Sequence, residues 1–299
     1  MTSVNEKQKA ESQVNFQKKP LSAGLYFVAT PIGSARDITL RALDILASAD
    51  VIAAEDTRTA RKLMEIHGVP LGDRPLIAYH DHNGAQVRPR LLAMLEQGKS
   101  VAYASEAGTP LVADPGYALS KAVIEAGYLV TSAPGPSAIL AALSIAGLPT
   151  DRFFFAGFAP NAKGQRQKFL EDLRDIPGTL VLYESPKRLK SFLGTCETVF
   201  GGERSAAVCR ELTKKFEEVV RGSVAELNQV FAERSVKGEI VVLIDRARGE
   251  GADAATMEEA LGNALKSMSV KDAANAVSEA LSIPRRTVYQ AALAMAKNR

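Results

Sequence analysis

The sequence VATPIGSARDIT, residues 28–39, joins an expected strand to an expected helix near the start of the chain. The apolar residues that lead into it predict a strand, and its Pro and Gly predict a turn. The leucines that follow recur at helical spacing and predict one apolar helix face: Leu40, Leu43 and Leu46. A dinucleotide-binding unit of this kind carries G-x-G-x-x-G, because the pyrophosphate must approach the backbone at the start of the helix. Here the stretch contains Gly33 alone, so it is not expected to hold a phosphate.

Short apolar runs alternate with helical patterns along the first half, which predicts an α/β domain with a largely parallel sheet. The strands expected there are 51–54, 76–79, 101–104 and 129–132. After a helix over 137–146, further strands are expected at 153–155, 179–183, 206–209, 217–221 and 239–244. Several of these lie close together in the sequence, so the second α/β domain is expected to have mixed or antiparallel pairing.

The chain has 299 residues, of which 46% are hydrophobic, and this suffices for two domains. The polar segment 1–22 predicts a disordered tail, since it has almost no apolar spacing. We expect the two α/β domains at 23–136 and 137–246, and a polar linker at 247–256.

The segment 257–299 predicts a small helical domain that resembles a helix-turn-helix. Two helices are expected around Ser282–Pro284, with these residues on one face: Val270, Ala273, Ala274, Val277 and Leu281. A helical pair that packs on a partner subunit is an equally good interpretation of this pattern.

Composition excludes several classes of protein. The two cysteines, Cys196 and Cys209, cannot form a disulfide framework and lack the spacing of metal ligands, which favours a reducing cytoplasm. There is no signal-peptide pattern, and no apolar run approaches the roughly 18 residues that span a bilayer, so we expect a soluble, cytoplasmic protein without a membrane partner. The net charge of +3 permits nucleic-acid binding without indicating it.

Loops rich in Gly, Pro and acidic residues follow the expected strands of the first domain: TPIGSARD (30–37), AEDTR (54–58), SEAGTPLVADPG (105–116) and APGPSA (133–138). In an open α/β sheet, ligands bind at the carboxyl ends of the strands. Gly and Pro allow the backbone to approach a ligand, while the last two loops have no Lys or Arg to neutralise phosphate. The loops therefore favour a bulky ligand without phosphate.

A series of motifs between residues 25 and 244 resembles the tetrapyrrole-methylase-like superfamily of S-adenosylmethionine enzymes, the class III methyltransferases. In chain order they are ATPIG…DIT.RAL, D.IAAEDTR, HDHN, GTPL..DPGY, PGPSA, GLP.DRF.F.GF, YESP.R, RELTK.FEE and GEIV. Within the superfamily they are similar to the family that methylates the ribose 2′-oxygen of a cytidine in 16S rRNA of the small ribosomal subunit. The resemblance implies two α/β domains, a small C-terminal helical domain, a bent S-adenosylmethionine between the α/β domains, and a homodimer.

The cofactor is expected to contact the Gly- and Pro-rich turns that follow successive strands: Pro31, Ile32, Gly33, Ser105, Glu106, Ala107, Gly108, Thr109, Pro110, Pro134, Gly135, Pro136, Ser137 and Ala138. The chain departs from the family pattern in two places. It has Ser34-Ala35 where the family usually has Asn-Leu, and Glu106 where the family usually has Asp.

Methyl transfer from a sulfonium needs in-line alignment and no metal. A ribose hydroxyl is a poor nucleophile, so a group that takes its proton would contribute roughly 10²–10⁴-fold. The candidates, which the sequence does not rank, are Asp56, Glu184, Glu211 and Lys214. Asp56 or Thr57 is also expected to cap the following helix.

RNA contacts are expected from basic residues in these motifs and in the C-terminal helices: Arg58, His80, His82, Arg188, Arg210, Arg285 and Arg286. On a strand, His80 and His82 would point to one face, but two histidines without a third ligand are a weak zinc signal, so no metal is expected.

Two other functions fit part of the sequence. One keeps the fold and changes the acceptor to a tetrapyrrole or a modified protein side chain. The other is a non-catalytic RNA- or DNA-binding protein that uses the C-terminal helices, but it leaves the four loops unexplained.

Overall fold

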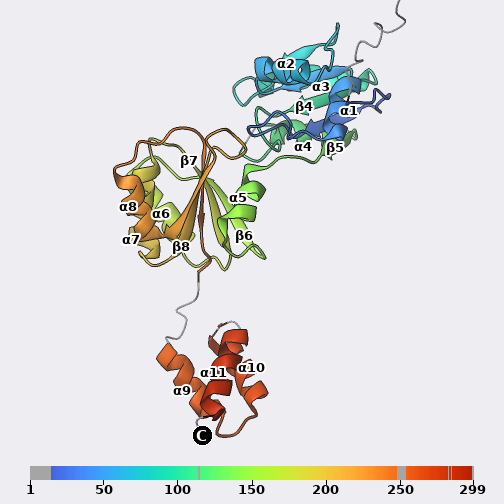
Figure 1. Cartoon of the computed structure of the whole chain (residues 1–299). Coiled ribbons are helices and arrows are strands. Elements are labelled where there is room, and N and C mark those ends of the chain that lie inside the picture. Colours follow the sequence, from blue (N-terminus) through green and yellow to red (C-terminus); the bar gives the residue numbers. More distant parts are fainter. Residues whose placement is uncertain (1–14, 114, 248–253, 282, 284, 298–299) are drawn as a thin grey trace, which may run out of the picture.

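The computed structural model describes residues 15–113, 115–247, 254–281, 283 and 285–297. Two α/β domains and a C-terminal group of helices follow one another along the chain (Figure 1). The first domain contains β1 (Gly24–Val28), α1 (Leu40–Ser48), β2 (Val51–Ala54), α2 (Thr57–Ile66), β3 (Leu76–Ala78), α3 (Gly84–Glu96), β4 (Ser100–Ala104), α4 (Tyr117–Glu125) and β5 (Leu129–Ala133). The second contains α5 (Ala138–Ala146), β6 (Phe153–Phe158), α6 (Lys163–Asp172), β7 (Thr179–Glu184), α7 (Leu189–Phe200), β8 (Ser205–Arg210), β9 (Glu218–Ser223), α8 (Val224–Ala232) and β10 (Ile240–Ile244).

The first sheet is parallel throughout, with the strand order β3-β2-β4-β1-β5, as the alternating pattern predicts. Its strands are almost continuously apolar because helices cover both faces. Helices α1 and α2 pack on one face, where Leu43 and Met64 are buried, and α3 and α4 pack on the other with Leu91 and Leu119. Since β4 lies between β1 and β2, loops that are far apart in the sequence meet at one edge of the sheet.

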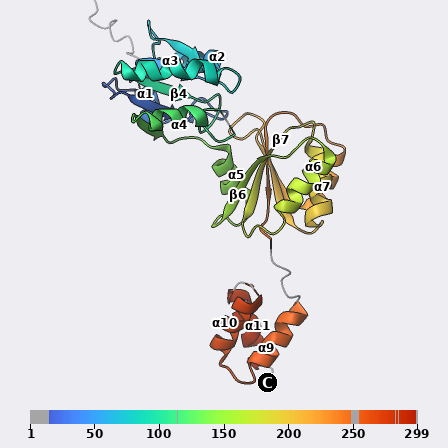
Figure 2. The same cartoon turned by 180° about the vertical axis from the view of Figure 1, so that it is seen from behind.

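The second sheet is mixed, as expected, with the order β6-β7-β10-β8-β9. Strands β6 and β7 are parallel, and the other neighbours are antiparallel. Helices α6, α7 and α8 cover one face, and α5 covers the other (Figure 2). Strands β6, β7 and β8 therefore all end at the same edge of the sheet.

Two details of the first domain differ from the sequence predictions. Leu40 is 66% exposed, because it is the first residue of α1 and precedes the buried turn, so Leu43 and Leu46 alone of the three leucines reach the core. In the segment expected to be disordered, Phe16 and Leu21 pack against the core of the first domain, and the N–H of Gln17 donates to Asp44. The apolar rings and branches of an otherwise polar segment explain this docking. Residues 1–14 lie outside the described part of the chain.

The C-terminal unit has three helices, α9 (Ala254–Ala264), α10 (Val270–Leu281) and α11 (Arg285–Lys297). Their core contains Leu261, Ala274 and Val288, and the predicted apolar face of α10 lies in it. The sequence pattern predicts only two helices here, and α9, which begins inside the segment expected to be a linker, was not predicted. Among the described residues, no helix combines the length and the apolar character needed to cross a bilayer.

Candidate active site between the two α/β domains

The loops after β1 and β4 are joined by a pair of backbone hydrogen bonds. The N–H of Thr30 donates to the carbonyl of Gly108 and the N–H of Gly108 donates back to Thr30, each at 2.9 Å. The buried Ser105 hydroxyl donates to the same Gly108 carbonyl at 2.6 Å. The Thr109 hydroxyl then reaches the carbonyl of Pro136 after β5 at 2.9 Å. Three of the loops predicted to bind the cofactor are thus fastened together at the carboxyl edge of the first sheet.

A small cavity lies where these loops meet the second domain. It is lined by apolar, hydroxyl and glycine residues from both domains: Ile32, Ala107, Gly108, Thr109, Val112, Ser137, Ala138 and Tyr183. No basic side chain is among these lining residues. The cavity has a volume of about 30 Å³, far below the roughly 300–1,000 Å³ of a typical ligand pocket, but its lining of apolar and hydroxyl side chains without a basic group matches the phosphate-free lining that the loop composition predicts.

Gly33 lies directly against a loop of the second domain. A Cβ atom at this position would lie 2.5 Å from Thr213 Oγ1, 2.6 Å from Lys214 Cγ and 2.9 Å from the carbonyl oxygen of Leu212. In addition, the N–H of Ser34 donates to Thr213 Oγ1 at 3.1 Å. A side chain is excluded at residue 33 because a loop of the second domain packs directly on the backbone there.

At Ser34, Ala35 and Glu106, where the sequence departs from the family pattern, the contacts with the rest of the protein are made by backbone groups. The Ser34 N–H bonds to the second domain, the Ala35 carbonyl lies 2.7 Å from His67 Nε2, and the Glu106 N–H donates to Glu55 Oε2 at 3.3 Å. These backbone contacts are available to any of the residue types concerned.

Unusual backbone conformation is concentrated in two loops of this region. Among the described non-glycine residues, a positive φ occurs at Leu111 (72°), Ala113 (61°), Glu211 (52°) and Thr213 (62°). Such conformations cost free energy and persist where the surrounding structure imposes them, commonly at ligand-binding sites. The loop after β4 and the loop after β8 are therefore held in specific shapes.

Glu211 and Lys214 form an ion-paired unit in the loop after β8. Lys214 Nζ lies 3.1 Å from Glu211 Oε1 and 2.9 Å from Glu239 Oε2. The N–H of Glu239 donates to Glu211 and lowers the pKa of that carboxyl, although partial burial acts in the opposite direction. Burial of Lys214 would lower its pKa, but the bonds to Glu239 and Glu211 outweigh this and raise it. A protonated Lys214 bonded to two carboxylates is unsuited to accept a proton.

Asp56 is the N-cap of α2, where its carboxylate accepts the N–H groups of Arg58 and Thr59. The Arg58 guanidinium also donates to both Asp56 oxygens, at 3.2 and 2.6 Å, and this side-chain bonding is the largest cause of a strongly lowered pKa. The capping interpretation of Asp56 is confirmed. Both oxygens are occupied, so Asp56 would be a weak base.

Glu184 has a fully buried side chain at the end of β7. Its Oε1 accepts the N–H of Ser185 at 2.7 Å and lies 3.1 Å from Arg188 Nε, while Arg188 also donates to the carbonyls of Ala159 and Pro160. Burial raises the pKa of Glu184 despite these partners. The pair thus fastens the loop after β6 to the end of β7, and the carboxylate is shielded from a substrate.

His80 and His82 do not lie on a strand, because β3 already ends at Ala78. The Asn83 side chain accepts the N–H of His80 and donates to the carbonyl of Ala78, and these bonds turn the chain. The two imidazole rings are still near each other, with centroids 5.9 Å apart. Among the described residues, no group of three or more His, Cys, Asp or Glu is arranged to hold a metal ion.

Glu55, at the end of β2, was not among the predicted catalytic residues. It is half-buried, and its pKa is raised, first by burial and then by the nearby charges of Glu106 and Asp81, against the N–H of Glu106 and the charge of His80. The position after an apolar strand is a sequence signal for it, but burial and the Glu106 contact are visible only in the fold. Tyr183 and Val112 in the cavity wall were missed for the same reason.

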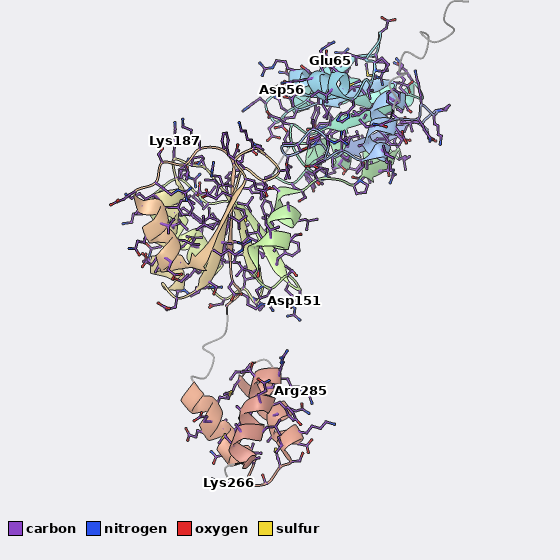
Figure 3. All side chains as sticks on the ribbon, in the orientation of Figure 1. Asp56, Glu65, Asp151, Lys187, Lys266 and Arg285 are labelled. Atoms are coloured by element: carbon purple, nitrogen blue, oxygen red, sulfur yellow. The ribbon has the colours of Figure 1, made fainter. Side chains whose placement is uncertain are left out.

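The residues predicted to bind RNA come from three parts of the chain. Arg58 pairs with Asp56 in the first domain, and Arg285 lies in the C-terminal helices. Figure 3 labels Asp56 and Arg285. Arg210 pairs with Glu218 at 3.1 Å and is only 18% exposed, so it is used within the second domain. The structure therefore leaves Arg58 and the C-terminal arginines more accessible than Arg210.

The fold and the cleft define the class of protein. The family model "Tetrapyrrole (Corrin/Porphyrin) Methylases" matches residues 24–228, and the model "RsmI C-terminal HTH domain" matches residues 251–296. The solved structure of the cobalt precorrin-4 methyltransferase CbiF is 16% identical and has a TM-score of 0.56, covering 75% of this chain and 95% of its own. A uroporphyrin-III C-methyltransferase from Thermus thermophilus, solved with S-adenosylhomocysteine, is 18% identical with a TM-score of 0.51 and covers 74% and 96%. The chain is a class III methyltransferase.

A relative from Mesorhizobium japonicum shows to which family within this class the chain belongs. It is named ribosomal RNA small subunit methyltransferase I and is 44% identical over 279 residues, which is 93% of this chain and 94% of the relative. The chain belongs to the ribosomal RNA small subunit methyltransferase I family, and the predicted fold class and family are confirmed.

Proposed function

We propose that this protein transfers a methyl group from S-adenosylmethionine to the ribose 2′-oxygen of a cytidine in 16S rRNA of the small ribosomal subunit. The observation that carries the proposal is the cleft in which loops after β1, β4 and β5 meet Tyr183 and the 211–214 loop, in a chain that belongs to this family. The names of the relatives support an rRNA substrate, whereas the atom and the nucleotide methylated come from the family resemblance.

The residues of the cleft fit S-adenosylmethionine. Ile32, Val112 and Ala138 line a cavity of only about 30 Å³, so the loops would have to move apart before these side chains could wall an adenine ring. Gly108, at φ +82°, lines the cavity without a side chain, while its N–H and carbonyl are bonded to Thr30 and the carbonyl also accepts the Ser105 hydroxyl. When bound, the cofactor supplies an electrophilic methyl group on a sulfonium. The apolar side chains and glycines of these loops would hold it, and a ligand without phosphate does not require the glycine fingerprint.

The 211–214 loop closes the cleft from the second domain. Its contact with Gly33 brings the two domains together beside Ile32, which lines the cavity. The ion pairs of Lys214 with Glu211 and Glu239 keep this loop in its strained shape. In the reaction, these residues orient the two domains around the cofactor and exclude water, and they leave proton transfer to another group.

Glu55 is the residue best suited to take the ribose proton. Unlike Asp56 and Glu211, it has a raised pKa, and unlike Glu184 it is not fully buried. One of its oxygens accepts the Glu106 N–H, which fixes the carboxylate beside the loop after β4. A basic carboxylate near that loop favours removal of the hydroxyl proton as the methyl group is transferred.

The C-terminal helices are proposed to dock the RNA without contributing to the chemistry. Arg285 and Arg286 are exposed at the start of α11, and Lys271 is exposed on α10. Such charges neutralise phosphates but do not read bases. We place the reaction in the cytoplasm, where small ribosomal subunits are found.

A homodimer is also part of the proposal. Exposed apolar side chains lie on α5 and the start of β6, where Leu140 is 55% exposed and Phe153 is 45% exposed beside a surface groove lined by both. A single-chain surface rarely leaves such groups together unless a partner covers them. Light scattering at micromolar concentration should give twice the mass of one chain, and a monomer would contradict this part.

A methylation assay tests the function directly. Purified protein with labelled S-adenosylmethionine should methylate isolated 30S subunits or free 16S rRNA, and nucleoside analysis should identify 2′-O-methylcytidine. Calorimetry should show S-adenosylmethionine binding. Methylation of a tetrapyrrole or a protein instead of rRNA would refute the acceptor, and absence of cofactor binding would favour a non-catalytic RNA-binding protein.

A further inference from the structure

We propose that Phe158, at the end of β6, forms with Tyr183 an aromatic platform on which the base of the acceptor nucleotide stacks. This inference rests on the proposed function and adds the surface that holds the target nucleotide. It concerns residues that neither the loop composition nor the basic residues pointed to.

A β-bulge in β6 puts the Phe158 ring on the side of the sheet that carries Tyr183. Phe155 pairs with Val181, and the register then shifts so that Phe158 pairs with Tyr183. In a regular strand, residues three apart point to opposite faces. The extra residue at the bulge, next to Gly157 at φ +69°, brings Phe158 onto the same face as Phe155 and Tyr183. Bulges beside active sites commonly re-aim one side chain in this way.

The rings at this end of the sheet are in contact. The centroids of Phe158 and Tyr183 are 5.4 Å apart at an interplanar angle of 60°, and those of Phe155 and Tyr183 are 4.9 Å apart at 65°. Such edge-to-face packing fixes the orientation of each ring. Phe155 is half-buried behind Tyr183, whereas Phe158 is 56% exposed and forms the outer end of the group.

The platform adjoins the proposed cofactor site. Tyr183 lines the same cavity as Ile32, Gly108 and Ser137. The Phe158 ring contacts Tyr183 and does not itself line the cavity. It lies at the end of the second sheet where β6 and β7 both end. A nucleotide whose base lies on this ring would have its ribose close to the cavity, which is the position methyl transfer requires.

A nucleobase suits this platform better than another occupant does. Unpaired RNA bases are held in proteins by stacking on aromatic rings. The exposed Lys163 and Lys187 follow the ends of β6 and β7, and Figure 3 labels Lys187 at the rim of the second domain. Cations that follow the same two strands whose ends carry the rings match a base with its attached phosphates, whereas a protein partner would favour a larger apolar surface.

The strand itself provides a matched control. Phe154 is 44% exposed and pairs with Leu180, a residue of the opposite core, so it lies on the other face of the same strand. Phe154→Ala removes an exposed ring without touching the platform. Because both rings are substantially exposed, neither substitution is expected to unfold the domain.

The experiment compares Phe158→Ala, Phe158→Leu, Phe158→Trp and the control Phe154→Ala. Each is assayed for kcat and KM with 30S subunits or 16S rRNA, for S-adenosylmethionine affinity by calorimetry, and for mass by light scattering. We expect Phe158→Ala to lower kcat/KM for RNA by roughly 5- to 150-fold, the range for loss of one stacked base. Phe158→Leu should lose nearly as much, while Phe158→Trp and Phe154→Ala keep the wild-type values. Cofactor affinity and mass should stay unchanged in all four variants.

Wild-type kinetics in Phe158→Ala would overturn the platform. Full activity in Phe158→Leu would also overturn it, because any apolar side chain would then suffice. A change in mass would do so too, because it would assign Phe158 to a subunit interface. Failure of the wild-type protein to methylate RNA would refute the proposed function instead. The wild-type assay thus separates the two proposals.

Discussion

Gly33→Ala tests the contact that closes the cleft. The new Cβ would lie 2.5 Å from Thr213 Oγ1, 2.6 Å from Lys214 Cγ and 2.9 Å from the Leu212 carbonyl oxygen. Side-chain rotation can move the first two atoms, but the Leu212 carbonyl belongs to the backbone, so the loops must separate. Overpacking of this kind costs about 1–3 kcal/mol of the free energy of unfolding.

The expected change is measurable by thermal unfolding. The two α/β domains together have the size for which each kcal/mol lowers the midpoint by roughly 2–4 °C, so Gly33→Ala should lower it by roughly 2–12 °C. Separation of the loops also displaces Ile32 from the cavity wall, and S-adenosylmethionine affinity should fall in calorimetry. Adding Thr213→Ala should restore only part of the loss, because the Leu212 carbonyl remains.

Gly164→Ala is the control for this prediction. Gly164 lies in α6 without a positive φ, and a Cβ there would have no atom within 4 Å. The substitution should leave stability unchanged or raise it by up to about 1 kcal/mol. A Gly33→Ala variant with the wild-type midpoint and wild-type cofactor affinity would refute the role assigned to this glycine.

Three further predictions concern the cofactor, the base and the RNA. Gly108→Leu places a side chain against Ile32 at a residue with φ +82°, so calorimetry on the folded variant should show weakened S-adenosylmethionine binding; unchanged affinity would remove this loop from the site. Because the pKa of Glu55 is raised, wild-type kcat should fall as pH is lowered through a value above that of an ordinary glutamate. Glu55→Gln should lose roughly 10²–10⁴-fold in kcat and the acid limb with it, while a retained limb would assign the proton to another group. Deleting residues 250–299 should preserve cofactor binding and weaken RNA binding. The dependence of RNA affinity on salt concentration should become less steep by about one unit per lost phosphate contact. Equal methylation with an unchanged salt dependence would reject the docking role.

The elements of the fold were predictable because their signals are local. Strand β2 matches its expected range, and β7, β8 and β10 differ from theirs by a residue or so at the ends. The parallel first sheet and the mixed second sheet also follow from the spacing of apolar runs. Helix α9 was missed because the Gly- and Ala-rich composition before it favoured a linker over a helix.

The candidate site was predictable in its loops but not in its side-chain roles. The three turns rich in Gly and Pro follow β1, β4 and β5, and their composition alone led to the prediction of a ligand without phosphate. Asp56 and Glu211 could not be separated from Glu55 by sequence, because all three are acidic residues that follow apolar strands. Their pKa values diverge only through burial and through partners such as Arg58.

Periodicity and motifs along the chain predict every strand and most helices, the parallel pairing of the first sheet, the mixed pairing of the second and the family. Three features emerge only from the folded chain: the contact that excludes a side chain at residue 33, the raised pKa values of Glu55 and Glu184, and the position of Phe158 on the same face as Tyr183. Each of these depends on contacts across large sequence separations or on a one-residue shift in register. The local pattern of apolar and polar residues does not encode long-range contacts or a shift in register, because the same pattern is compatible with different packing partners.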